Sequence, residues 1–173
     1  MNSLAILTGL LDPDRARRVA DSLLASLDLA RATVYYSHYL FEALARCGRV
    51  DALVLRLDLW RHLADQGFTT TPEMPEPTRS DCHAWGAHPL FHFFASILGI
   101  RPTGAGFRTI LIEPQLGGLA HAEGTMVHPL GEVHVKAEMK GGNLTGSARI
   151  PAGAKAILRA GGKDRLFEGS CAF

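Results

Sequence analysis

Residues 133–150 read Val-His-Val-Lys-Ala-Glu-Met-Lys-Gly-Gly-Asn-Leu-Thr-Gly-Ser-Ala-Arg-Ile. Apolar and polar side chains alternate on both sides of the Gly141-Gly142 step. Alternation with a period of two is typical of a half-buried strand, because successive side chains point to opposite faces. A Gly-Gly pair adopts the positive φ angles that a two-residue hairpin turn requires. The stretch therefore predicts an antiparallel β-hairpin.

The hairpin belongs to a predicted β-rich half of the chain, residues 101–173. Two more candidate strands, Thr109–Glu113 and Lys155–Arg159, are bounded by Gly and Pro residues. Such bounded runs are typical of short strands. We expect a small antiparallel β domain, joined to the rest by a Gly- and Pro-containing linker at about residues 99–106.

Residues 1–100 have the pattern of helices instead. Asp12 followed by Pro13 is typical of a helix N-terminus, and later helices are expected to stop at Gly48 and Gly67, which suit C-terminal caps. Helices are expected at about residues 3–11, 13–27, 33–47, 51–66 and 83–98, with Pro89 kinking or delaying the last. The sequence thus predicts an α+β chain in two parts.

Composition excludes several classes of protein. Hydrophobic residues make up 47% of the 173 residues and the net charge is +1, unlike a disordered tail or a basic nucleic-acid binder. Three widely spaced cysteines favour free thiols in a reducing compartment. No apolar run approaches the roughly 18 residues that span a membrane. We expect a soluble, cytoplasmic protein with neither nucleic acid nor membrane as a partner.

A Pro-rich loop at residues 67–88 carries the candidate site. It holds three carboxylates, a histidine and a tryptophan, namely Glu73, Glu76, Asp81, His83 and Trp85. Carboxylates for proton transfer beside an aromatic ring suit sugar hydrolysis. Pro72 and Pro75 stiffen the backbone around Glu73, and a catalytic base needs rigid support.

Each of these acids and rings also has an ordinary structural interpretation. A loop carboxylate such as Glu73 is usually solvated; Glu76 and Asp81 are expected at the surface, with Asp81 a candidate N-cap. His83 is typical of a structural hydrogen-bonding residue and Trp85 of a core residue. The tyrosines of the third helix are expected to pack through their rings: Tyr35, Tyr36 and Tyr39.

Metal and thiol chemistry have weaker support. His88 and His92 are four residues apart and share a helical face, but the sequence offers no third ligand at metal spacing and no HExxH pattern. We therefore expect no metal and no cofactor. Cys82 precedes His83, but adjacency in sequence does not make a nucleophile and base, and an orienting third group is missing.

Two stretches resemble the bacterial α-L-rhamnosidases of glycoside hydrolase family 78: residues 67–73, Gly-Phe-Thr-Thr-Thr-Pro-Glu, and 78–85, Thr-Arg-Ser-Asp-Cys-His-Ala-Trp. Residues 39–44 upstream, and 98–102 and 112–114 downstream, agree with this resemblance. It implies the last helices of a catalytic (α/α)6 barrel in residues 1–100, and a C-terminal β-sandwich in residues 101–173.

The resemblance also implies roles for individual residues. Glu73 falls at the family's general base and His83 at a sugar-contacting histidine, while Trp85 belongs to the same motif and is a candidate for substrate binding. The sequence departs from the family at Pro72, where many members carry tryptophan, and in the short stretch from Glu73 to His83. The implied reaction is inverting hydrolysis of a terminal α-L-rhamnosyl residue.

In this family the general acid comes from an earlier part of the barrel. We therefore expect a C-terminal fragment with weak or no activity alone, which associates with the rest of the barrel or with itself. The expected ligand is a rhamnose-containing glycoside. Two alternatives stay open: a non-catalytic carbohydrate-binding or interaction module, and a fragment of another (α/α)-barrel glycosidase.

Overall fold

The computed structural model describes residues 2–173, which divide into two compact units. The first ends at His92 and the second runs from Phe93 to Phe173. The predicted linker at residues 99–106 is therefore part of the second unit, and Ile100–Pro102 within it is strand β1. The assignment of residues 1–100 to a barrel stays a prediction.

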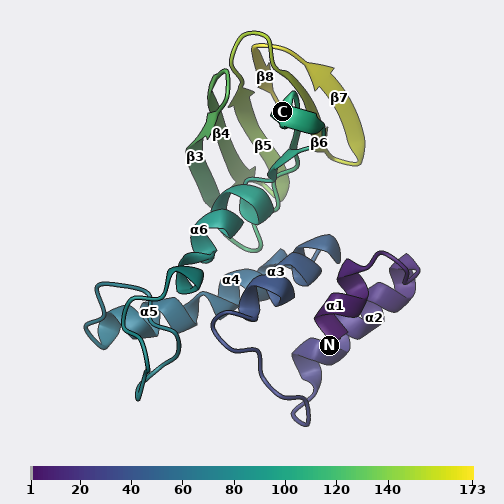
Figure 1. Ribbon diagram of the computed structural model, residues 1–173. Helices are drawn as coiled ribbons and strands as arrows, with labels where there is room; N and C mark the ends of the chain where they lie inside the picture. The colour runs from purple at the N-terminus through teal and green to yellow at the C-terminus, as the bar shows by residue number, and fades with distance from the viewer. Residues whose placement is uncertain (1) are drawn as a thin grey trace. The chain divides into compact units, whose positions relative to one another are not determined.

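The first unit is helical (Figure 1). Its elements are α1 Asn2–Leu7, α2 Pro13–Ala25, α3 Ser37–Arg46, α4 Val50–Arg56, α5 Asp58–Asp65, the 3₁₀-helix η1 Ala84–Ala87 and α6 Pro89–His92. The predicted cap of α2 is confirmed, since the Asp12 side chain accepts a hydrogen bond from the Arg15 N–H at 2.9 Å. Gly48 (φ 71°) and Gly67 (φ 92°) follow helices in left-handed conformations, as expected for C-terminal caps.

Two predicted helices differ from the structure. The segment at residues 51–66 is divided at Leu57, which ends α4 and precedes α5. The segment at 83–98 is η1, α6 and then π-helix η2, Phe93–Ile97, in the second unit. Pro89 lies where α6 begins, because its missing N–H is tolerated only in the first turn of a helix.

The core of the first unit lies between its N-terminal helices. Ile6 of α1, Ala20 of α2 and Leu44 of α3 belong to one buried apolar cluster. Phe41, also on α3, is fully buried and packs edge-on against the rings of His88 and His92. Helix α3 therefore supports both the apolar core and a group of histidines.

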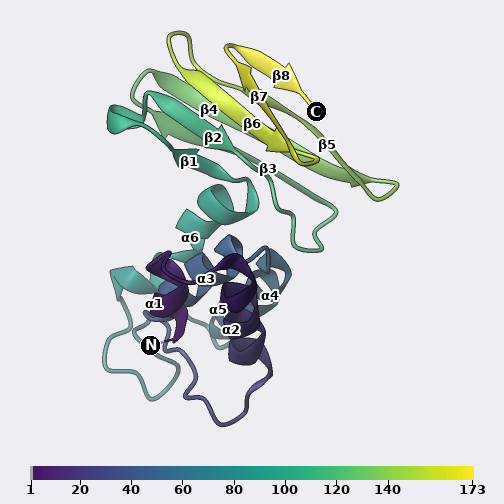
Figure 2. The same cartoon turned by 90° about the vertical axis from the view of Figure 1, so that its right-hand side faces the viewer.

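The second unit contains two four-stranded sheets, ordered β1-β2-β6-β7 and β3-β4-β5-β8, which Figure 2 shows as two layers. The strands are β1 Ile100–Pro102, β2 Thr109–Ile112, β3 His121–His128, β4 Gly131–Lys140, β5 Asn143–Arg149, β6 Lys155–Ala160, β7 Lys163–Phe167 and β8 Ser170–Ala172. A short 3₁₀-helix η3, Ala105–Phe107, precedes β2.

The predicted hairpin is confirmed. Strands β4 and β5 pair antiparallel up to Lys140 opposite Asn143, and Gly141 and Gly142 have φ of 56° and 82°, the signs of a type I′ turn. The expectation of purely antiparallel pairing is wrong at one place, since β2 and β6 are parallel. A crossover that passes through the other sheet separates these two strands in the chain, and this permits parallel pairing.

One apolar core fills the space between the two sheets. Ile110 and Ile112 of β2 face Val133 and Val135 of β4, and all four side chains are fully buried. Full burial of such side chains stabilises a fold by roughly 1.5–3 kcal/mol each. Gly99 (φ 70°) lies against the backbone of Glu113, where an added Cβ would be 2.0 Å from the carbonyl oxygen. The second unit is thus a β-sandwich with its own core.

Candidate functional site

Hydrogen bonds close the candidate loop at its base. The His83 N–H donates to the Thr71 carbonyl at 2.7 Å, and the Thr71 hydroxyl donates to the His83 carbonyl at 3.0 Å. Further along, the Glu73 N–H donates to the Ser80 carbonyl at 2.9 Å. The two arms of the loop therefore hold the backbone of Glu73 in a fixed position.

Glu73 presents a half-buried carboxylate. Its side chain is 23% exposed and pairs through Oε1 with Arg79, which is 75% exposed. Within residues 2–173 the second oxygen, Oε2, accepts no hydrogen bond. One carboxylate oxygen of Glu73 is therefore held by a cation and the other is not.

Gly86 brings the two ends of the loop together. A Cβ at this position would lie 2.9 Å from the Pro72 carbonyl oxygen and 2.9 Å from the Thr71 Cβ. The Trp60 indole N–H donates to the Gly86 carbonyl at 2.6 Å. Pro72, which precedes Glu73, is itself fully buried. The backbone next to Glu73 is therefore packed directly against the backbone next to Trp85.

The structure overturns the expectation that Trp85 is a core residue. Its side chain is 59% exposed. The indole stacks on Tyr35 with centroids 4.4 Å apart and planes inclined by 26°, and the His83 ring meets it edge-on at 6.0 Å. His83 and Trp85 are thus brought together on the surface, with Tyr35 beneath the indole.

Tyr35 is a site residue that sequence reasoning missed, because the tyrosines were expected to pack. Its hydroxyl lies 3.1 Å from that of Tyr39, and this hydrogen bond is the main cause that raises the pKa of Tyr35. Tyr39 in turn contacts the rings of Tyr36 and His38. A row of aromatic rings therefore leads from the exposed indole to α3.

The other loop acids have structural surroundings. Glu76 is exposed and accepts from the Thr78 N–H at 3.0 Å. Asp81 is exposed but is not an N-cap, since His83 precedes η1 and no side chain caps that helix. Cys82 is an exposed free thiol. Among the loop acids, Glu73 alone combines partial burial with an ion pair.

Three histidines converge in the same unit. One ring nitrogen from each of His38, His88 and His92 lies within 4.8 Å of those of the other two. A third ligand for His88 and His92 could not be recognised from the sequence, because His38 lies 54 residues before His92. Imidazole nitrogens gathered in this way are the donor set that divalent transition metals prefer.

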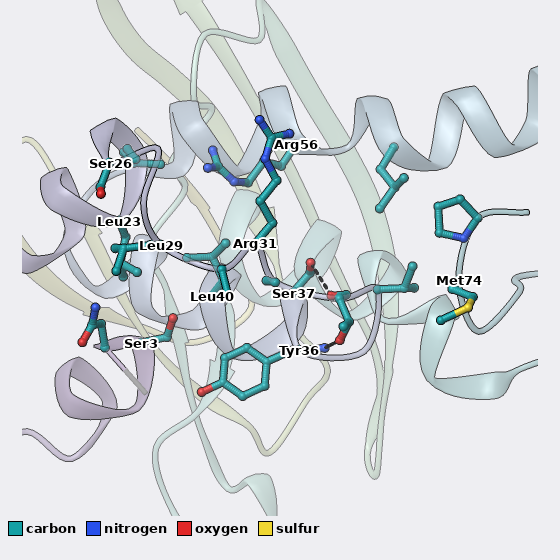
Figure 3. Close-up of a pocket in the computed structure, with 18 of the residues that line it drawn as sticks. Ser3, Leu23, Ser26, Leu29, Arg31, Tyr36, Ser37, Leu40, Arg56 and Met74 are labelled. Carbon is teal, nitrogen blue, oxygen red and sulfur yellow. Dashed lines mark hydrogen bonds between the residues drawn. The ribbon is translucent and has the colours of Figure 1, made fainter. Parts of the chain in front are cut away.

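The first unit also contains a pocket of about 1080 Å³ (Figure 3). Its lining is largely apolar and includes Leu27, Leu40 and Met74, together with two arginines, Arg31 and Arg56. Burial lowers the pKa of Arg56, and the positive charge of Arg31 lowers it further. The pocket thus combines apolar walls with two like charges.

The second unit resembles a domain of known proteins. Residues 99–166 match the family described as bacterial alpha-L-rhamnosidase C-terminal domain. The chain is similar to the C-terminal part of family 78 α-L-rhamnosidases. No curated protein matches it.

Solved structures share the fold of the chain. A family 78 rhamnosidase of Bacillus sp. GL1 matches 91% of this chain with 26% identity and a TM-score of 0.74. Rhamnosidases of Streptomyces avermitilis, solved with L-rhamnose, and Dictyoglumus thermophilum share the fold over 99% of the chain, with 23% and 15% identity and TM-scores of 0.75 and 0.74. The chain spans only 19%, 20% and 24% of these three proteins.

None of the helices within residues 2–173 has both the length and the apolar character that crossing a bilayer demands.

Proposed function

We propose that this chain is the C-terminal part of an inverting α-L-rhamnosidase, with Glu73 as the general base. The observation that carries the proposal is the position of Glu73. Its half-buried carboxylate lies in a hydrogen-bonded loop, whose other arm leads to His83 and the exposed Trp85. The match of residues 99–166 to a rhamnosidase domain supports this proposal independently.

In the proposed reaction Glu73 activates a water molecule. Oε2 accepts the proton as the water oxygen attacks the anomeric carbon, while Arg79 holds Oε1. An inverting enzyme needs a second carboxyl group roughly 6.5–9.5 Å away to protonate the leaving oxygen. We propose that this acid comes from a part of the barrel outside residues 1–173, as in the family that the loop resembles.

Sugar binding is assigned to the rings beside the loop. Tyr35 covers one face of the Trp85 indole, so the 59% exposure of Trp85 comes from its other face and its edges. An aromatic face of this kind packs against the apolar side of a sugar ring. His83 lies at the edge of the indole, where its ring nitrogens are suited to hydrogen-bond sugar hydroxyls.

The partner of the chain is proposed to be the rest of the barrel. The apolar pocket that Leu27 and Leu40 line is suited to packing against further helices. Arg31 and Arg56 are suited to acidic groups on that partner, because in the described residues the charge that acts on the Arg56 pKa is a like charge. This part of the proposal follows from the small share of the solved rhamnosidases that the chain spans.

A chimera tests the catalytic proposal. This chain replaces the equivalent segment of the Bacillus rhamnosidase, and a panel of nitrophenyl glycosides is assayed with the chimera and with the chain alone. We expect the chimera to hydrolyse the α-L-rhamnoside, and Glu73→Gln to lower the rate by about 10²–10⁴-fold. Equal rates for Glu73→Gln and the parent chimera would disprove the role of Glu73, and activity on another glycoside alone would favour another (α/α)-barrel family.

A non-catalytic carbohydrate-binding module is the second candidate, favoured by the exposed stack of Trp85 on Tyr35. It predicts that the chain alone binds L-rhamnose and that Glu73→Ala leaves this binding unchanged. Titration of the wild type and Glu73→Ala with L-rhamnose, followed by tryptophan fluorescence, distinguishes the two candidates. The enzyme proposal expects Glu73→Ala to weaken binding, because the base contacts the same sugar.

A further inference from the structure

His38, His88 and His92 form a cluster that the rhamnosidase chemistry does not use. The three residues come from α3, from the residue before α6 and from the end of α6. His92 is completely buried, and His38 and His88 are half-buried. A single ring nitrogen of each lies within 4.8 Å of the others. The cluster is therefore shielded and convergent.

The tautomer of His88 follows from its hydrogen bond. Nε2 lies 3.0 Å from the Val34 carbonyl oxygen, which can only accept, so Nε2 carries the proton of the neutral ring. Nδ1 consequently presents a lone pair. This atom is buried and, in residues 2–173, has no hydrogen-bond partner. The geometry therefore leaves the Nδ1 lone pair available to a ligand.

The other two rings face each other. His38 Nδ1 lies 3.1 Å from His92 Nε2, so one of the two nitrogens donates a proton to the lone pair of the other. The opposite nitrogen of His92, Nδ1, lies 3.8 Å from a Glu42 carboxylate oxygen. Metal-binding histidines commonly direct their second nitrogen to a carboxylate or a backbone carbonyl. His92 has the former arrangement and His88 the latter.

We propose that His38, His88 and His92 form a binding site for a divalent transition metal such as Zn²⁺. The ion takes the place of the proton between His38 Nδ1 and His92 Nε2, and that proton moves to the opposite nitrogen of its own ring, so that both imidazoles stay neutral. His88 Nδ1 supplies the third bond. Neutral imidazoles suit Zn²⁺, Cu²⁺, Ni²⁺ and Fe²⁺, and hard oxygen-seeking ions such as Mg²⁺ and Ca²⁺ bind elsewhere.

The spacing fits such an ion after a small closure. Zn–N bonds of about 2.0–2.1 Å hold the nitrogens of a tetrahedral site roughly 3.4 Å apart. The His38–His92 pair already has 3.1 Å, so mainly His88 moves. Aromatic side chains surround the cluster, with Phe91 edge-on to His38 and Trp60 edge-on to His88. Three protein ligands leave the fourth position for a water molecule or another small donor.

Zinc titration of the full chain tests this site. Protein treated with a chelator is titrated with ZnCl₂ by calorimetry at pH 7.5, and thermal unfolding is recorded with and without the ion. We expect one Zn²⁺ per chain and a higher Tm with zinc. His38→Gln and His88→Gln should each weaken the affinity at least about tenfold. His62→Gln, an exposed histidine on α5, is the matched control and should bind zinc as the wild type does.

Two results would overturn the proposal. One is the absence of stoichiometric zinc binding to wild-type chain; the other is an affinity that His38→Gln and His88→Gln leave unchanged while the variants keep the wild-type circular dichroism. Should a variant fail to fold, nitrogen NMR of the wild type decides. Zinc must then shift the NMR signal of His88 Nδ1. A shift at His62 or at other exposed rings without a shift at His88 would disprove the proposal.

Discussion

The Trp85 indole lies on the ring of Tyr35, with centroids 4.4 Å apart and planes inclined by 26°. Tyr35 precedes α3, whereas Trp85 lies in η1, at the end of the candidate loop. The Tyr35 hydroxyl is fixed by Tyr39 at 3.1 Å, so the lower ring of the stack is anchored to the helix. An exposed tryptophan held flat in this way is a preformed surface, which costs little conformational entropy when a ligand binds.

Trp85→Ala should weaken binding of L-rhamnose while leaving the fold intact. Aromatic stacking contributes about 0.5–1.5 kcal/mol beyond buried area, which corresponds to a roughly 2- to 10-fold loss of affinity. The side chain is 59% exposed, so its removal leaves no internal cavity. NMR titration of both proteins with L-rhamnose gives the affinity, and thermal unfolding gives the stability. Leu166→Ala, an exposed residue of β7, is the control and should change neither.

Gly86→Ala should destabilise the first unit and displace the loop. The new Cβ would lie 2.9 Å from the Pro72 carbonyl oxygen, and forcing atoms into a packed region typically costs about 1–3 kcal/mol. Denaturant unfolding measures the loss. Gly67→Ala is unsuitable as a control because of its positive φ, so Ala84→Gly, in the same helix η1, serves instead. If Gly86→Ala unfolds at the same denaturant midpoint as the wild type, this result would contradict the close packing of Pro72 on Gly86.

Local signals in the sequence were sufficient to predict the elements that depend on residues nearby in the chain. The Asp12 cap and the hairpin at Gly141-Gly142 are confirmed because both rest on contacts within a few residues. Strand β7 has no such signal, since Lys163–Phe167 begins with three charged residues and shows no alternation of apolar and polar side chains. It forms because its backbone pairs with β6. Strand β1 is similar: Ile100–Pro102 resembles a linker until β2 pairs with it.

The residues of the candidate site also differ in whether a local stretch of sequence or a distant contact identifies them. Glu73 and His83 were identified through a motif in one short stretch of sequence, and their roles stay predictions. The partner of Trp85 is Tyr35, and the third histidine beside His88 and His92 is His38. Both come from around α3, and only the packing of α3 against the loop brings them there. A helical face does not specify in one sequence which distant segment covers it.

Stability of the second unit should depend on pH through Glu138. Lys136 and Lys140 flank it on β4 at 2.8 Å each, and their hydrogen bonds and charges lower its pKa to about 2. A depressed carboxyl pKa stabilises the fold above the unfolded-state value, and the effect is lost as pH falls towards 2. Glu138→Gln should therefore unfold at a lower Tm than the wild type at pH 7 and at the same Tm near pH 2. A Tm difference that stays constant between pH 7 and pH 2 would contradict the lowered pKa of Glu138.

Arg56→Met should raise the Tm of the chain by itself. Burial and the charge of Arg31 both lower the Arg56 pKa, so the charged form is destabilised in the folded protein. Methionine keeps the length of the side chain and removes the charge. If the pocket accepts acidic groups of the remaining barrel, the same substitution should lower activity of the Bacillus chimera. Scanning calorimetry and the rhamnoside assay measure the two effects, and Arg61→Met, an exposed α5 residue paired with Asp58, is the control.

Self-association should arise from the apolar side chains that the first unit exposes. Leu27, in the lining of the pocket, is 92% exposed. Apolar patches of this kind promote association, and a hydrophobic contact does not weaken as salt rises, unlike one between charges. We expect sedimentation velocity to give species larger than a monomer at high concentration, and Leu27→Asp to reduce them. Leu166→Asp places the same charge on the second unit, where Leu166 is 66% exposed, and should leave the association unchanged. A wild-type chain that sediments as a monomer at all concentrations would show that this surface needs no partner.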